Sequence, residues 1–385
     1  MIPYGRQDIQ DDDIAAVVEV LRSDFLTQGP KVPAFEAAVA SHCGVAHALA
    51  VNSATSALHI ACLALGVGRG DLVWTSPITF VASANCALYC GAEIDFVDID
   101  PATFNLCPKA LKEKLDVAKA AGKLPKVVIP VHMTGQSCDM ASIRELSFQY
   151  GFAVIEDASH AIGGRYRDTV IGSCAYSDIT VFSFHPVKII TTAEGGMALT
   201  QNADLARSMA LLRSHGITRE ASLMEEESHG PWYYEQQALG YNYRMTDMQA
   251  ALGVSQMKHL DAWVARRQVL ADRYDQLLRD LPVIAPVRVS DRYSALHLYV
   301  IQLDQDKTGK SRREVFESLR AAGVGVNVHY IPVHLQPYYK RLGFTAGQYP
   351  LSEAYYARAI SLPMFPKMTE QQQDTVVNAL KQALS

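Results

Sequence analysis

The chain has 385 residues, of which 49% are hydrophobic and 19% are charged, and its formal net charge is −5. This composition excludes an intrinsically disordered chain and predicts a globular protein with one large or two medium domains. No cluster of Lys and Arg is present, so nucleic acid is not expected as a partner, and no apolar run is long enough to span a membrane.

The cysteines and the N-terminus indicate a compartment. Seven cysteines, an odd number, all lie between Cys43 and Cys174. Cys86 and Cys90, the pair closest in the chain, do not have a zinc-ribbon spacing. We therefore expect free thiols in a reducing cytoplasm and no bound metal. Residues 1–13 are polar and acidic, unlike a signal peptide.

Two helices are predicted first. Apolar residues from Ile9 to Leu21 recur at helical spacing and indicate an amphipathic helix. After a break around Gly29 and Pro30, a second helix is expected from about residue 33 to 43, with Gly44 as its C-cap.

Short apolar strands then alternate with helices. Strands are expected at 47–51, 72–74, 93–97, 127–131, 152–155, 178–184 and 196–200, and helices at 54–65, 80–89, 109–120, 140–150 and 204–213. This alternation predicts an α/β fold with a large, mostly parallel, seven-stranded sheet that carries helices on both faces. Ligands of such sheets bind outside the carboxyl ends of the strands.

The last third of the chain predicts a smaller α+β domain. Residues 216–240 are polar and irregular and indicate a mobile surface loop. A long helix (246–281), a strand (296–303), a helix (311–322), a strand (324–330) and a helix from residue 370 are expected after it. We place the large domain at 1–260 and the small C-terminal domain at 261–385.

Lys188 stands just after the apolar strand at 178–184 and before a run of small residues that ends at Gly196. A lysine removed from water has a lowered pKa, and its amine can then form a Schiff base. The hypothesis is that Lys188 carries pyridoxal 5′-phosphate (PLP); the alternative is a surface lysine at a strand end. A PLP site also requires a carboxylate at the ring nitrogen, a phosphate cradle and a group against the ring face.

Each of these parts has a candidate at a predicted strand end. Asp157 would keep the ring nitrogen protonated, while strand alternation points Glu156 to the other face; the alternative for Asp157 is an N-cap. The small hydroxyl residues of 52–58 open a helix whose free N–H groups suit a phosphate, unless they serve as plain caps. Ser183 could add a hydroxyl there. Phe80 could stack on the ring or belong to the core.

The chain also resembles the DegT/DnrJ/EryC1/StrS family, fold-type I PLP-dependent aminotransferases that act on nucleotide-linked keto sugars. The resemblance covers essentially the whole chain and is carried by these segments: Leu26-Thr27-Gln28-Gly29, Asn52-Ser53-Ala54-Thr55-Ser56-Ala57-Leu58, Pro77-Ile78-Thr79-Phe80-Val81-Ala82, Ser159-His160-Ala161, Phe182-Ser183-Phe184-His185, Lys188 to Gly196, Arg213-Ser214-His215-Gly216, Gly240-Tyr241-Asn242-Tyr243-Arg244 and Val328-His329-Tyr330. One departure is visible, because Ile189-Ile190 follows the lysine where the family often has proline nearby.

The resemblance implies roles for individual residues. Lys188 would be the Schiff-base lysine and the acid–base catalyst, Asp157 the partner of the ring nitrogen and Phe80 the stacking ring. Asn242 would reach the cofactor of the neighbouring subunit, which implies a homodimer with shared active sites. Further contacts to the cofactor are expected from Ala54, Thr55, Ser159 and Ser183, and contacts to the substrate from Thr27, His185, Arg244, His329 and Tyr330.

The resemblance also implies a reaction. An amino group would move from L-glutamate to C4 of a nucleotide-linked 4-keto-6-deoxy sugar. The flanking residues look most like those of the pseudaminic acid pathway, where the substrate is UDP-2-acetamido-2,6-dideoxy-β-L-arabino-hexos-4-ulose. The same reaction on another UDP-, dTDP- or GDP-linked sugar stays open, as does a non-catalytic PLP-binding regulator. Related dehydratases have histidine in place of Lys188, and amino-acid aminotransferases have a late arginine in a context that Arg358 does not match.

Overall fold

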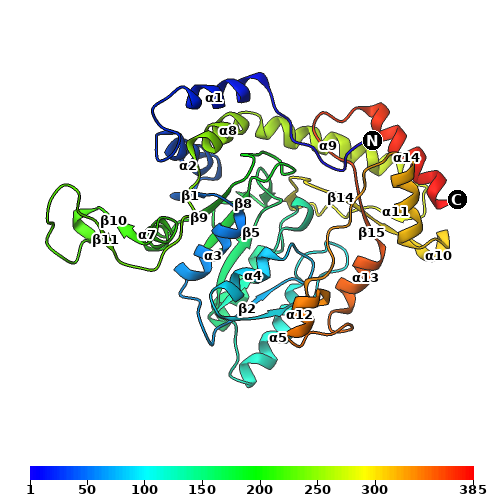
Figure 1. The fold of residues 1–385 in the computed structure, drawn as a ribbon. Helices are drawn as coiled ribbons and strands as arrows, with labels where there is room; N and C mark the ends of the chain where they lie inside the picture. The colour runs from blue at the N-terminus through cyan, green and yellow to red at the C-terminus, as the bar shows by residue number, and fades with distance from the viewer.

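The computed structural model describes residues 1–385, and its centre is the large sheet (Figure 1). Its seven strands are β1 (His47–Val51), β2 (Leu72–Thr75), β3 (Glu93–Phe96), β4 (Val127–Ile129), β5 (Ala153–Asp157), β8 (Ile179–Ser183) and β9 (Gly196–Thr200). They lie in the order β1-β9-β8-β5-β4-β2-β3. Only β9 runs antiparallel to its neighbours. The predicted seven-stranded, mostly parallel sheet is therefore confirmed.

Helices cover both faces of this sheet, because successive strand residues point to opposite sides. Val181 packs in the core under one set of helices, whereas Phe182 packs in the core under the other. The first set is α3 (Ala54–Ala64), α4 (Ala82–Tyr89) and α7 (Ala203–Leu212). The second set is α2 (Lys31–Cys43), α5 (Pro108–Ala120), α6 (Met140–Tyr150) and α8 (Asp247–Met257), and α1 (Asp11–Leu21) lies across α8.

The long helix predicted for residues 246–281 is in fact two helices. α8 ends at Met257, and α9 (Leu260–Leu277) begins after Lys258 and His259. The first turn of α9 packs on the large core through Trp263, while its later turns pack on the small core through Tyr274. Periodicity alone does not report such a break, since neither proline nor glycine marks it.

The C-terminal part has its own core around a three-stranded antiparallel sheet. This sheet contains β12 (Val283–Ile284), β14 (Tyr299–Leu303) and β15 (Ala359–Leu362). The later turns of α9, together with α11 (Arg312–Ala321) and α14 (Glu370–Leu384), cover it. The N-terminus joins this part, because Ile2 packs against its core. The domain boundary near residue 260 stays a prediction.

The strand predicted at residues 324–330 is wrong. Val324 and Asn327 make only isolated bridges, to Ile2 and Ser361. The alternating side chains of this segment resemble a strand, but its backbone leaves the small sheet after Asn327. Residues 327–330 then border the cavity described below.

An arm projects from the body between α7 and α8 (Figure 1). It occupies the region predicted as a loop and contains the short strands β10 (Ile217–Thr218) and β11 (Glu235–Gln236) and the turn η2 (Ala221–Leu223). Its Trp232 and Leu239 side chains are 73% and 80% exposed. Large apolar side chains gathered on an extended arm are typical of a surface that contacts another chain.

The remaining elements are short. They are a small sheet of β6 (Arg165–Tyr166), β7 (Thr169–Val170) and β13 (Arg292–Tyr293), the turns η1 (Met133–Gly135) and η3 (Val333–Leu335), and the helices α10 (Gln305–Thr308), α12 (Pro337–Arg341) and α13 (Pro350–Arg358). All seven cysteines are free thiols. No helix has both the length and the apolar character that crossing a membrane requires.

Candidate active site

A cavity of about 580 Å³ opens at the carboxyl ends of β5 and β8, with residues 327–330 of the C-terminal part on its border. Ten of the residues predicted for the site line it: Ala54, Thr55, Phe80, Asp157, Ser159, Ser183, His185, Lys188, His329 and Tyr330. These residues come from segments that are far apart in the chain. The fold therefore brings the candidate cradle, ring stack, carboxylate and lysine to one place.

Lys188 lies in the loop between β8 and β9, and this loop is closed at its base. The N–H of Phe184 donates to the carbonyl of Gly195 across 2.9 Å, and the N–H of Lys188 donates to the carbonyl of His185 across 2.9 Å. Burial lowers the pKa of the Lys188 amine to about 8, although the charge of Asp157 opposes the shift. A neutral amine is thus accessible near neutral pH, as a nucleophilic lysine requires.

Asp157 is the last residue of β5, and its carboxylate is buried and held in place. Oδ2 accepts a hydrogen bond of 2.6 Å from the Ser83 hydroxyl, and Oδ1 accepts one of 3.1 Å from the N–H of Ser159. Thr79 and Ser83 share a further hydrogen bond of 2.7 Å. Sequence reasoning missed Ser83, whose only signal is its place one helical turn after Phe80.

The start of α3 has the features of an anion cradle. The Ser53 hydroxyl caps the helix by accepting the N–H of Ser56 across 3.1 Å. Ala54 and Thr55, the first two residues of α3, line the cavity. Their backbone N–H groups have no partner within the helix and can bind a ligand. Gly196 permits this arrangement, because a Cβ at that position would lie 2.4 Å from the backbone nitrogen of Ala54. A helix N-terminus with free N–H groups favours a phosphate.

Aromatic and imidazole rings form another wall of the cavity. Phe80 is 60% exposed, and its ring centre lies 6.3 Å from that of Tyr330. The Tyr330 hydroxyl and Nε2 of His160 share a hydrogen bond of 3.1 Å. Burial, together with the charge of Lys188, lowers the pKa of His160 and brings that of His329 to about 3. Both imidazoles are therefore neutral near physiological pH.

Two residues of this wall were not anticipated. Tyr4 packs its ring 5.4 Å from the ring of His329, and Asn327 lies beside them. Burial raises the pKa of Tyr4, against the effect of Asn327. Tyr4 reaches the cavity because the backbone of Ile2 pairs with Gly323 and Gly325. No sequence signal in the polar N-terminus pointed to this role.

Three predicted residues do not line this cavity: Thr27, Asn242 and Arg244. Thr27 is exposed and bridges Thr246. Asn242 is exposed and bridges Ser214, whose hydroxyl accepts a hydrogen bond of 3.0 Å from Arg244. Their roles toward a second subunit or a substrate stay predictions.

The donor set of the cavity fits PLP. It combines an amine of lowered pKa, a buried and oriented carboxylate, a helix N-terminus with two free N–H groups, and an exposed aromatic ring. These match the aldehyde, the ring nitrogen, the phosphate and the ring face of the cofactor. Together, the fold and the site define an aminotransferase of PLP fold type I.

Comparison with known proteins makes the assignment specific. The model of the DegT/DnrJ/EryC1/StrS aminotransferase family matches residues 7–381, so the chain belongs to that family. It is 41% identical over 383 residues to the spore coat polysaccharide biosynthesis protein SpsC of Bacillus subtilis, and the match covers 99% of this chain and 96% of SpsC.

Solved structures agree with this family. Helicobacter pylori PseC, an aminotransferase involved in the biosynthesis of pseudoaminic acid, is similar with a TM-score of 0.91 and 31% identity, covering 100% of this chain and 99% of that chain. Spr1654 of Streptococcus pneumoniae, a putative sugar aminotransferase, is similar in its PMP form with a TM-score of 0.90 and 29% identity, covering 100% of this chain and 99% of that chain. It has also been solved in a PLP form. The protein is therefore a sugar aminotransferase.

Proposed function

We propose that this protein uses PLP to move an amino group from L-glutamate to C4 of a nucleotide-linked 4-keto-6-deoxy sugar. The observation that carries the proposal is that Lys188 and Asp157 line the same cavity. The Lys188 amine has a pKa lowered to about 8, and the buried Asp157 carboxylate accepts two hydrogen bonds. A lysine at this position suits amino transfer, because its amine can both form the Schiff base and move a proton.

Each residue of the site has its own role in the proposed reaction. PLP, when bound, supplies an electron sink for the carbon that loses its proton. Lys188 would hold the cofactor as a Schiff base and, once released, its amine would take the proton from that carbon and deliver it to C4′ of the cofactor. Asp157 would hold a proton at the ring nitrogen, Ala54, Thr55 and Ser183 would bind the phosphate, and Ser159 would support Asp157 through its N–H. Because amino donor and acceptor use the same site in turn, ping-pong kinetics are expected.

The wall formed by Tyr4, Asn327, His329 and Tyr330 is polar but uncharged near neutral pH. Hydroxyl, carboxamide and neutral imidazole groups suit the hydroxyl and acetamido groups of a sugar. His185 stands exposed at the edge of the cavity and is proposed to contact the same substrate. The similarity to PseC supports UDP-2-acetamido-2,6-dideoxy-β-L-arabino-hexos-4-ulose as the acceptor. Another UDP-, dTDP- or GDP-linked 4-keto-6-deoxy sugar is the second candidate.

A homodimer with shared active sites is part of the proposal. Lys188 is the only Lys or Arg among the residues that line the cavity. A cofactor phosphate, a nucleotide diphosphate and the carboxylates of glutamate all require cationic or N–H partners. The exposed arm and the exposed Asn242 are suited to provide contacts to a second subunit. Thr27 and Arg244 are proposed to reach the substrate in that assembly.

The test offers the purified, PLP-loaded protein a panel of nucleotide-linked 4-keto-6-deoxy sugars with L-glutamate. Formation of one 4-amino sugar together with 2-oxoglutarate would support the proposal, and the amino sugar identifies the acceptor. Glutamate alone should bleach the yellow colour of the holoenzyme. A protein that binds PLP but turns over none of these sugars would favour the non-catalytic alternative, and a colourless protein that takes up no PLP would refute the site.

A further inference from the structure

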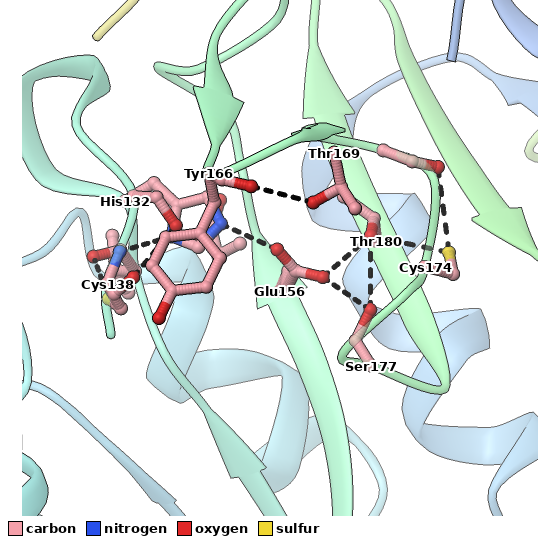
Figure 2. A network of polar contacts seen from close by, with 12 residues as sticks. His132, Cys138, Glu156, Tyr166, Thr169, Cys174, Ser177 and Thr180 are labelled. Carbon is pink, nitrogen blue, oxygen red and sulfur yellow. Dashed lines mark hydrogen bonds and ion pairs between the residues drawn. The ribbon is translucent and has the colours of Figure 1, made fainter. Parts of the chain in front are cut away.

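A buried polar network joins β5, the start of β8 and the segment after β4 (Figure 2). Its centre is Glu156, the neighbour of Asp157 on β5. As strand alternation predicts, the two carboxylates point to opposite faces: Asp157 lines the cavity, whereas Glu156 contacts His132. The chemistry proposed above gives this second carboxylate no role.

Glu156 accepts hydrogen bonds from three side chains. Nε2 of His132 lies 2.7 Å from Oε2, and the hydroxyls of Ser177 and Thr180 donate to Oε1 across 2.5 Å and 3.3 Å. Burial alone would raise the pKa of Glu156, but these donors lower it. Glu156 is therefore an ionised carboxylate with both oxygens satisfied, which holds its side chain in one conformation.

The ring of His132 is also held on both sides. The backbone N–H of Cys138 lies 3.2 Å from Nδ1, and Nε2 donates to Glu156. Burial would lower the pKa of His132, but its contacts with Cys138 and Glu156 raise it, so Nε2 keeps its proton near neutral pH.

The same His132 contacts Asp157 through the backbone. The N–H of His132 donates to the carbonyl of Asp157 across 3.0 Å, and the N–H of Asp157 donates to the carbonyl of Pro130 across 2.9 Å. These bonds extend the pairing of β4 and β5 beyond Ile129, the last residue of β4. On the other side of β5, Glu156 lies in register with Thr180 of β8, the strand that leads to Lys188. The network thus joins the carboxyl ends of β4 and β5 to the start of β8.

We propose that His132 and Glu156 are positioning residues for Asp157. Holding the Glu156 side chain restrains the backbone of β5 at residue 156, and the backbone bonds to His132 and Pro130 restrain it at Asp157, which together orient the Asp157 side chain. His132 closes the arrangement, since its ring holds Glu156 and its backbone holds Asp157. The inference rests on the proposed function, in which Asp157 binds the ring nitrogen of PLP.

A second His–Glu pair in the chain provides a matched control. His334 is fully buried, and its Nε2 lies 3.0 Å from Oε1 of Glu353, as in the His132 pair. Neither His334 nor Glu353 lines the cavity. His132→Leu and His334→Leu each remove a buried imidazole from a glutamate, so both should lower the melting temperature.

The experiment compares PLP affinity and the pH midpoint of the visible absorbance band of the PLP-loaded enzyme. His132→Leu should weaken PLP binding at least about tenfold, the effect typical of lost supporting hydrogen bonds around a bound group. It should also shift the pH midpoint, because a displaced Asp157 holds the ring-nitrogen proton less firmly. His132→Gln keeps a donor toward Glu156 and should restore both values toward the wild type. His334→Leu should leave both unchanged.

Equal changes in His132→Leu and His334→Leu, or no change in His132→Leu, would overturn the inference. If His132→Leu does not fold, Thr180→Val removes one donor to Glu156 at nearly constant shape and should shift the pH midpoint in the same direction. Failure of the proposed function has a different signature, because the wild type itself would then take up no PLP or aminate no sugar.

Discussion

The hydroxyl of Ser83 donates a hydrogen bond of 2.6 Å to Oδ2 of Asp157, and both residues are buried. Ser83 stands on α4, one turn after Phe80, and Asp157 ends β5. The bond therefore links the helix next to the proposed stacking ring to the strand that carries the proposed partner of the ring nitrogen.

Removing this hydroxyl should weaken cofactor binding. A hydrogen bond to a charged group contributes about 1.5–3 kcal/mol, so Ser83→Ala should raise the dissociation constant of PLP by roughly tenfold or more. Ser147→Ala is the matched control. The Ser147 hydroxyl is also buried, but it donates to the carbonyl of Phe152 and does not line the cavity. PLP titrations followed by absorbance measure both variants, and equal affinities would contradict a role for Ser83.

The pKa of Lys188 predicts how the apoenzyme captures PLP. Below a pKa of about 8 the amine is protonated and cannot attack the aldehyde, and as pH rises through this value the neutral amine appears. The capture rate should rise about tenfold between about pH 7 and about pH 9 and then level off. Stopped-flow absorbance measures it, with Lys188→Ala as the variant that forms no Schiff-base band. A rate that keeps rising toward the ordinary lysine pKa of 10.5 would show that burial does not act on Lys188.

Gly196 should tolerate no side chain. A Cβ there would lie 2.4 Å from backbone atoms of Ser53 and Ala54, so Gly196→Ala must push β9 away from the start of α3. Overpacking of this kind costs about 1–3 kcal/mol of unfolding free energy. PLP affinity should fall as well, because the displaced atoms belong to the proposed phosphate cradle. Gly68→Ala is the control, since nothing lies within 4 Å of its added Cβ. Gly196→Ala should therefore melt at a lower temperature and bind PLP more weakly than Gly68→Ala, as measured by thermal melts and PLP titrations.

Mixed dimers test the shared active site. Lys188→Ala should be inactive because it lacks the acid–base amine, with a loss of at least about 10²–10⁴-fold. Asn242→Ala should be inactive because its subunit offers no contact to the neighbouring cofactor. A random mixture of the two chains contains heterodimers with one complete site, so it should recover about a quarter of the wild-type activity. A mixture as inactive as its components would show that Asn242 acts within its own subunit, whereas a fully active Asn242→Ala variant would show that it has no role.

Much of the fold follows from local patterns. All seven strands of the large sheet were predicted, and Gly196–Thr200 was predicted with the same bounds as β9. Buried strands and amphipathic helices have distinct periods, which the sequence carries directly. The errors fall where tertiary packing decides. The break at Lys258 and His259 divides one predicted helix between two cores, and residues 327–330 border a cavity instead of continuing a strand.

The sequence by itself determined which chemical groups are present and which face of a strand each occupies. Lys188, Asp157 and the hydroxyl residues before α3 stand at or just after strand ends, and alternation alone separates Asp157 from Glu156. Only the tertiary structure decided which distant residues meet. Tyr4 reaches His329, and Ser83 reaches Asp157, through the packing of segments far apart in the chain. Burial likewise arises only when these segments close around Lys188, and it is burial that lowers the pKa of its amine to about 8.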